Sequence, residues 1–193
     1  MVRKADFDQD SFINAAIELV TLGGPGAATM SAIARSTGAP TGSLYHRFPS
    51  RTALMGAAWL RALGSLCDHI LPQLAQNKPD QAVRSLTRWT QENPSFARLI
   101  MLYEESDIID GPLPEELHQK LAHIHQALGK ALSSLLKSLD KKLSPGNMAL
   151  VNFALFDGPI AAMKPALRGG QEISAPCMNA ALACCQATLK ILE

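Results

Sequence analysis

The stretch from Thr29 to Leu54, TMSAIARSTGAPTGSLYHRFPSRTAL, places the tightest constraint on what this chain can fold into. Thr29 can cap a helix, because its hydroxyl can accept a hydrogen bond from an orphan backbone amide. Gly38 stands where a glycine permits a left-handed residue and so ends a helix. Apolar residues recur between these two positions at helical spacing, namely Met30, Ile33 and Ala34. The stretch therefore begins with a short helix and a tight glycine turn.

A second short helix is predicted after the turn, from about Pro40 to His46. Proline suits the first turn of a helix, where its missing N–H costs little. Leu44 is the one inward anchor of this helix, and its other side chains are mostly small or polar. Such a helix is poorly suited to a core, but its backbone can come close to another surface. Helix, glycine turn, helix is the arrangement in which the second helix enters the major groove of DNA.

The same stretch resembles the TetR family of transcriptional regulators. The residues that carry the resemblance are Ile33-Ala34, Gly38, Gly42, Leu44-Tyr45, Phe48 and Arg51. They keep the family's spacing without a gap over about a quarter of the chain. Two positions depart from the family's pattern. Pro40 stands where the family often has a serine, and Arg51 replaces the more usual lysine, which preserves the charge but changes the donor geometry.

The distribution of charge favours a nucleic-acid partner for this part of the chain. The formal net charge is only +1, yet no Asp or Glu occurs between Leu19 and Cys67. The same interval contains four arginines, which are Arg35, Arg47, Arg51 and Arg61. A segment with bases and no acids can approach phosphates without repulsion. The alternative is that a segment rich in small residues simply has few charges, and the motif inside it argues against that alternative.

Composition excludes several other classes of protein. Of the 193 residues, 47% are hydrophobic and 18% are charged, as in an ordinary folded chain. No long uncharged apolar run predicts a membrane span, and the charged N-terminus MVRKADFDQD lacks the apolar core of a signal peptide. We therefore expect a cytoplasmic protein. Arg3 and Lys4 form either a DNA-contacting arm or a loose terminus, and the sequence favours the loose terminus.

No motif in the sequence points to catalysis, a cofactor or a metal. There is no glycine-rich phosphate loop, GxSxG or HExxH, so we expect that the protein is not an enzyme and uses no cofactor. The steps between His118, His123 and His125 suit metal ligands on one helix poorly. The four cysteines lack CxxC spacing and should be free thiols in a reducing compartment. Oxidant sensing remains open for Cys177, Cys184 and Cys185 but is less expected than a packing role.

Apolar periodicity predicts an all-α fold of about nine helices and no strand. We expect the helices near residues 8–22, 30–37, 40–46, 51–71, 79–93, 94–103, 115–142, 145–168 and 174–190, with a loop over 107–114. The 51–71 helix is apolar nearly all round, so it should be buried on more than one side. Pro159 should kink or shorten the helix that contains it. Residues 1–50 are assigned to a three-helix DNA-binding domain and 51–193 to a regulatory and dimerisation domain, with helix 51–71 as the connector.

Two sets of site residues follow from the motif and from the resemblance. The residues predicted to contact DNA are Thr29, Ser31, Pro40, Thr41, Gly42, Ser43, Tyr45, His46 and Arg51. In the family, apolar and aromatic side chains of the larger domain line a ligand cavity. The resemblance therefore implies ligand-binding roles for Trp59, Trp89, Phe96, Tyr103, His123, Phe153 and Phe156. For each of these seven residues, a plain core position is an equally good interpretation.

The sequence as a whole predicts a sequence-specific DNA-binding transcriptional regulator. The resemblance implies a homodimer joined through the last two helices, bound to a palindromic operator. It also implies a repressor that a small apolar or aromatic molecule releases from double-stranded DNA. A DNA-binding regulator without a ligand is the first alternative, and an enzyme built on a helical bundle is the second.

Overall fold

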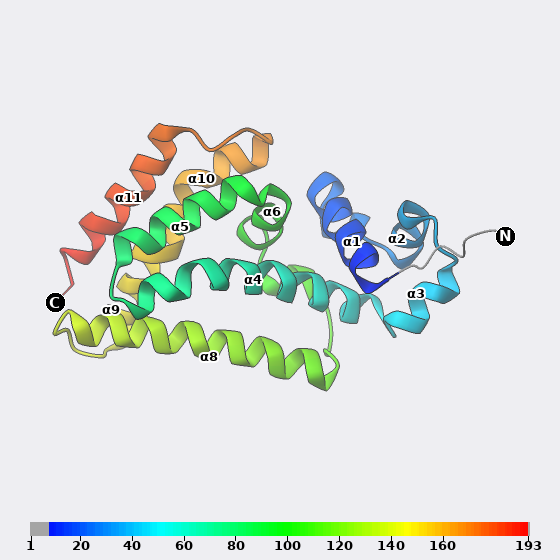
Figure 1. Cartoon of the computed structure of the whole chain (residues 1–193), viewed down its shortest axis with the longest axis horizontal. Coiled ribbons are helices and arrows are strands. Elements are labelled where there is room, and N and C mark those ends of the chain that lie inside the picture. The colour runs from blue at the N-terminus through cyan, green and yellow to red at the C-terminus, as the bar shows by residue number, and fades with distance from the viewer. Residues whose placement is uncertain (1–7, 193) are drawn as a thin grey trace.

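The computed structural model describes residues 8–192, and every regular element in that range is a helix (Figure 1). Arg3 and Lys4 lie outside the described residues. The helices are α1 (Gln9–Gly23), η1 (Pro25–Ala27), α2 (Met30–Thr37), α3 (Thr41–Arg47), α4 (Arg51–Ala75), α5 (Pro79–Glu92), α6 (Pro94–Leu102), α7 (Glu105–Ile108), α8 (Glu115–Ser138), α9 (Pro145–Asn152), η2 (Phe153–Asp157), α10 (Gly158–Gly169) and α11 (Ala175–Leu189). The all-α prediction is confirmed for these residues.

The ends of the N-terminal helices are fixed by local hydrogen bonds that the sequence predicted. The Thr29 hydroxyl accepts from the Ala32 amide at 3.1 Å and caps α2. The Ser50 hydroxyl accepts from the Ala53 amide, also at 3.1 Å, and caps α4. Gly38 ends α2 with φ +69°, a left-handed conformation that costs glycine least. These caps set where α2 begins and ends and where α4 begins.

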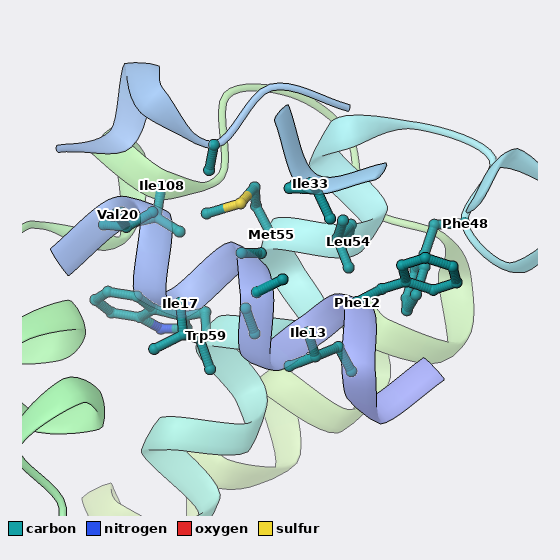
Figure 2. Packing of buried hydrophobic residues seen from close by; sticks show 14 of the residues in the cluster. Phe12, Ile13, Ile17, Val20, Ile33, Phe48, Leu54, Met55, Trp59 and Ile108 are labelled. Atoms are coloured by element: carbon teal, nitrogen blue, oxygen red, sulfur yellow. The ribbon is translucent and has the colours of Figure 1, made fainter. Parts of the chain in front are cut away.

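The long helix α4 runs through the middle of the molecule and contributes to every buried cluster (Figure 1). Its first half packs Leu54, Met55 and Trp59 against α1 (Figure 2). Its second half places Leu66 and Ile70 in another cluster, and its last turn places Leu74 in a third. The helix extends one turn beyond the predicted end because it continues through Pro72. The expectation that this helix is buried on several sides therefore holds.

The packing of the N-terminal helices does not stop at the boundary proposed after residue 50. The cluster around α1 and α2 also buries Leu99 from α6, Ile108 from α7 and Leu121 from α8. Ile108 is fully buried and belongs to the same cluster as Val20 (Figure 2). Elements of the regulatory part therefore reach into the core of the helix-turn-helix, although the two parts are separate along the chain.

Two local features differ from the sequence-based expectations. The first two residues of the predicted 107–114 loop belong to the single-turn helix α7, at whose N-terminal end the Glu104 amide donates to Asp107 Oδ2 at 2.9 Å. The helix that contains Pro159 does not end there, because α9, η2 and α10 follow one another without a break. The π-helical turn η2 widens the helix just before the proline, and the Gly158 amide bonds to the Phe153 carbonyl. A wider turn accommodates a residue that has no N–H to donate and a ring that would meet the preceding carbonyl.

Trp89 is fully buried and ties α5 to α4, because its Nε1–H donates to Ser65 Oγ at 2.9 Å. We expect Trp89→Ala to lower the free energy of unfolding by about 3–5 kcal/mol, since it leaves a large cavity. Trp89→Phe should cost less, because it keeps most of the apolar volume. Urea denaturation of both variants measures the two losses. A loss of less than about 1 kcal/mol for Trp89→Ala would contradict this core role.

Candidate functional site

The exposed face of α3 is the most distinctive surface of the N-terminal helices. Leu44 is fully buried and fixes this seven-residue helix against the core. Tyr45 is 52% exposed, and its neighbour His46 is also exposed. Thr41 and Gly42 at the start of the helix are exposed as well, while Ser43 is half-buried. The helix therefore turns small, hydroxyl-bearing and aromatic groups away from the protein.

The first turn of α2 and the start of α3 add to this surface. Thr29 and Ser31 are both exposed, and their hydroxyl oxygens lie 3.2 Å apart. Pro40 is exposed at the N-terminal end of α3. Eight of the nine residues predicted to contact DNA thus lie in, or directly before, two adjoining short helices, and all eight are exposed or partly exposed. The ninth, Arg51, has different surroundings.

Two of the four arginines in the acid-free interval are paired with acids from outside it. Arg61 forms an ion pair with Asp10 of α1 and donates to Asn14 Oδ1 at 3.2 Å. Arg51 forms an ion pair with Asp110, with 2.7 Å between Nη1 and Oδ2. Arg35 and Arg47 are exposed and have no ion pair within residues 8–192. The net positive charge of this surface therefore resides mainly on Arg35 and Arg47.

The Arg51 guanidinium has three acceptors within the protein. Its Nε–H donates to the Ala28 carbonyl at 3.0 Å, and Nη2 donates to the Pro25 carbonyl at 2.7 Å. Nη1 makes the ion pair with Asp110, whose other carboxylate oxygen accepts from the Thr52 hydroxyl at 2.8 Å. The side chain of Arg51 is only 24% exposed. The guanidinium is thus held by acceptors that the sequence did not predict, and the contact of Arg51 with DNA stays a prediction.

The pairing of Asp110 is maintained over the ordinary pH range. The hydrogen bond from Thr52, together with the charge of Arg51, lowers the pKa of Asp110 below its usual value. A carboxylate with a lowered pKa in the folded state stabilises the fold at every pH above its unfolded pKa, which is about 4. The stabilisation is lost only as the pH falls through the lowered folded pKa. Asp110 is therefore ionised, and its contacts with Thr52 and Arg51 persist, at pH 5–8.

A small apolar pocket lies between α4, α6, α8 and the α9–η2–α10 helix. Its volume is about 220 Å³, and its lining is Trp59, Leu63, Leu66, Cys67, Ile70, Ile100, Met101, Leu128, Leu132, Asn152, Phe156 and Ile160. Burial raises the pKa of the Cys67 thiol to about 11, so this thiol stays protonated and apolar. Such a lining suits a small hydrophobic molecule.

Two polar groups belong to the residues around this pocket. Trp59 is only 6% exposed, and its Nε1–H has no hydrogen-bond acceptor among the described residues. The Asn152 side-chain amide donates to Oδ2 of Asp157, the last residue of the π-helical turn, at 2.9 Å. This hydrogen bond fixes the orientation of the Asn152 side chain. A buried N–H without an acceptor is costly and rare in folded proteins. The pocket is thus bordered by an indole whose donor is unused.

The structure brings together only part of the predicted ligand set. Trp59 and Phe156 line the pocket. Trp89 is enclosed in the core, and Phe96 packs between two of the buried clusters. Tyr103 packs against the N-terminal cluster, His123 is exposed on α8, and Phe153 is 45% exposed beside a different groove.

The lining residues that the prediction missed are mostly aliphatic, such as Leu63, Ile100, Leu128 and Ile160. Aliphatic side chains carry no sequence signal that separates a pocket wall from a filled core.

A wider surface cleft of about 700 Å³ lies between α1, the α5–α6 junction and the end of α10. Its lining includes Glu18, Arg98 and Glu172 together with several amides and hydroxyls. The charged and polar lining suits water and ions better than a hydrophobic ligand. The smaller apolar pocket is therefore the better candidate for an effector of the kind expected from the sequence.

Comparison with known proteins agrees with this arrangement. Residues 12–58 match the family model described as bacterial regulatory proteins, tetR family. The chain carries the DNA-binding domain of the TetR family. The matched residues include all of α2 and α3 and the first turns of α4. The prediction of a TetR family transcriptional regulator is thereby confirmed.

Solved structures extend the likeness from this domain to the whole TetR fold. A TetR family transcription regulator from Marinobacter aquaeolei has a TM-score of 0.66 and 18% identity, covering 91% of this chain and 94% of its own. The fatty acid degradation regulator FadR from Bacillus halodurans has a TM-score of 0.68 and 16% identity, with 97% of each chain covered. The TetR family regulator PfmR from Thermus thermophilus has a TM-score of 0.64 and 22% identity, covering 98% and 99%.

At these identities the likeness concerns the fold. No curated protein matches the chain. Within the described residues, none of the helices has the length and hydropathy required to cross a bilayer. The same part of the chain contains no cluster of His, Cys, Asp and Glu side chains that could hold a metal ion.

The different surroundings of Arg47 and Arg61 predict different salt dependence of DNA binding. Arg47→Ala should flatten the slope of log K against log salt by about one unit, since it removes one exposed and unpaired charge beside the proposed DNA-binding surface. Arg61→Ala should leave the slope unchanged, because that charge is already paired with Asp10. Fluorescence anisotropy with labelled DNA at several salt concentrations measures both slopes. Equal slopes for the two variants would contradict this assignment.

Proposed function

We propose that this TetR family regulator is a homodimeric repressor that reads a palindromic operator with α2 and α3. A small, mainly apolar effector in the pocket beside Trp59 and Phe156 releases it from DNA. The observation that carries the DNA-binding part is the exposed polar face of α3, held by the buried Leu44 inside the matched family domain.

The proposed DNA contacts divide into two kinds. Thr41, Gly42 and Ser43 open the recognition helix, where small side chains allow close approach to base edges. The exposed side chains of Tyr45 and His46 project from α3 and suit contacts to phosphate and sugar. Thr29, Ser31 and Pro40 lie beside them and complete the surface. Phosphate contacts set the register, whereas base contacts provide the sequence preference.

A two-fold dimer is expected because one recognition helix reads too few base pairs to select a site in a genome. The far end of the regulatory part carries exposed apolar side chains that favour a partner. Leu143, Phe153 and Ile191 are 55%, 45% and 62% exposed, and Phe153 and Ile191 border the same groove. A second copy of the chain is the proposed occupant of this end of the molecule.

The chemistry of the pocket defines the proposed effector. Its size admits a compact molecule with an apolar body. The unused Trp59 donor favours an effector that also carries a hydrogen-bond acceptor, such as a carbonyl oxygen. One structural neighbour is named a fatty acid degradation regulator, which is consistent with an effector that has an apolar chain or ring. Because α4 borders both the pocket and the N-terminal core, a ligand that shifts α4 would move the helix-turn-helix.

Selection of binding sites from random DNA tests the proposed reading of an operator. We expect an inverted repeat whose half-sites are about 34–36 Å apart, or a multiple of that spacing, because two-fold symmetry fixes the separation. Thr41→Ala should change the preferred bases, whereas Tyr45→Phe should weaken binding on all sequences alike. Sedimentation without DNA should give about twice the chain mass of 20.7 kDa. Recovery of no preferred sequence by the wild type, or a clean monomer, would contradict the proposal.

Titration with the matched pair naphthalene and 2-acetylnaphthalene tests the proposed effector site. Both probes should quench tryptophan fluorescence and weaken operator binding, since both have a compact aromatic body. The ketone should bind about fivefold more tightly, which corresponds to one additional hydrogen bond of about 1 kcal/mol. Trp59→Phe should abolish that advantage and leave naphthalene binding nearly unchanged. If neither probe altered fluorescence or DNA binding, the regulator without a ligand would be the better description.

A further inference from the structure

The start of α4 contacts the segment between Glu104 and Pro114, which contains α7 and the loop after it. Asp110 accepts from Thr52 at 2.8 Å and pairs with Arg51 at 2.7 Å. Leu113 lies so close to Gly56 that a Cβ built on that glycine would be 2.3 Å from Leu113 Cδ2. The loop therefore contacts α4 over its first two turns, through polar groups at one point and apolar groups at the next.

The same arginine also holds the connection that precedes the helix-turn-helix. Pro25 and Ala28 belong to the turn between α1 and α2, and their carbonyls accept from Nη2 and Nε of Arg51 at 2.7 and 3.0 Å. A guanidinium is planar, so acceptors bound to its different edges are held at fixed angles to one another. Arg51 thus joins three segments: the turn before α2, the start of α4 and the Asp110 loop.

Apolar packing at this junction does not by itself fix the angle between the helix-turn-helix and α4. Ile108 is fully buried in the N-terminal core, and Met55 and Leu54 pack in the same cluster. Apolar contacts are non-directional, so they hold the parts together but tolerate small rotations. Hydrogen bonds weaken steeply when their geometry departs from linear. The polar contacts of Arg51 and Asp110 are the directional part of the junction.

We propose that Asp110 is a positioning residue for operator binding. Through Arg51 and Thr52 it sets the orientation of α2 and α3 relative to α4, although it does not contact DNA. Arg51 accordingly acts as an internal bridge and not as a phosphate ligand. The inference rests on the proposed reading of a palindromic operator, because only a paired site requires a fixed distance between two recognition helices.

Whether Asp110→Asn raises or lowers operator affinity distinguishes a positioning role of Asp110 from a purely electrostatic effect on DNA binding. Removing an acid next to a DNA-binding domain, and freeing an arginine, should increase DNA affinity if charge alone matters. If Asp110 positions the helices, Asp110→Asn should lower operator affinity about tenfold. Affinity for non-specific DNA should change less than twofold. Glu18→Gln is the matched control, because it removes an exposed acid of α1 that makes no ion pair with a described residue.

The experiment measures operator and non-specific affinities for the full-length wild type, Asp110→Asn, Arg51→Ala, the double variant and Glu18→Gln, across a range of salt. We expect Arg51→Ala to lower the ratio of specific to non-specific affinity without changing the salt slope of non-specific binding. The double variant should lose no more than the larger of the two single losses, since both changes break one bridge. Retained non-specific binding also shows that the domain is folded.

Three results would overturn the inference. They are an unchanged or increased operator affinity in Asp110→Asn, a salt slope flattened by about one unit in Arg51→Ala, or additive losses in the double variant. A wild type that prefers no sequence would instead refute the proposed function itself. The two failures are therefore distinguishable in the same set of titrations.

Discussion

The burial of α4 on several sides is the constraint on which the rest of the structure depends. Leu54, Met55 and Trp59 of this helix complete the core of the N-terminal helices, while Leu66, Ile70 and Leu74 complete the clusters of the larger part. Each fully buried side chain of this size contributes about 1.5–3 kcal/mol, so neither part can release α4 without a large loss. A displacement of α4 must therefore be shared by both parts of the molecule.

The burial of α4 explains why the two parts of the molecule are coupled. The polar contacts at the start of α4 explain how the orientation of one part relative to the other is set. Arg51 reaches the carbonyls of Pro25 and Ala28 on one side and Asp110 on the other. The helix-turn-helix is thus held in two ways, by apolar packing in the core and by the directional hydrogen bonds of Arg51. In this arrangement the exposed face of α3 is free for DNA, because the residues that support it are occupied inside the protein.

Local signals made most of the fold predictable from the sequence. Thr29, Gly38 and Ser50 act on amides and dihedral angles within a few residues, so their roles follow from their neighbours alone. The recognition helix was predictable because the motif lies in one unbroken stretch. The internal partners of Arg51 were not predictable, since Asp110 lies 59 positions away and no local pattern links the two. The pocket was only partly predictable, because its walls are aliphatic residues that look the same as core. Pro159 was expected to kink or shorten its helix, but the helix continues through it after a π turn that the composition does not predict.

Under the proposed function, a ligand beside Trp59 would have to move the start of α4 only slightly. The two residues lie on the same helix eight positions apart, or about 12 Å at the rise of an α-helix. Trp59 borders the pocket and also packs in the N-terminal core, so a ligand that draws its indole toward an acceptor acts on both at once. A tenfold change in operator affinity corresponds to about 1.4 kcal/mol, and by linkage the operator must weaken ligand binding by the same factor. One buried hydrogen bond gained at Trp59 supplies energy of that order. In the proposed mechanism, a shift of the contacts around Arg51 would turn this energy into a changed angle of the recognition helix, and neither part would have to unfold.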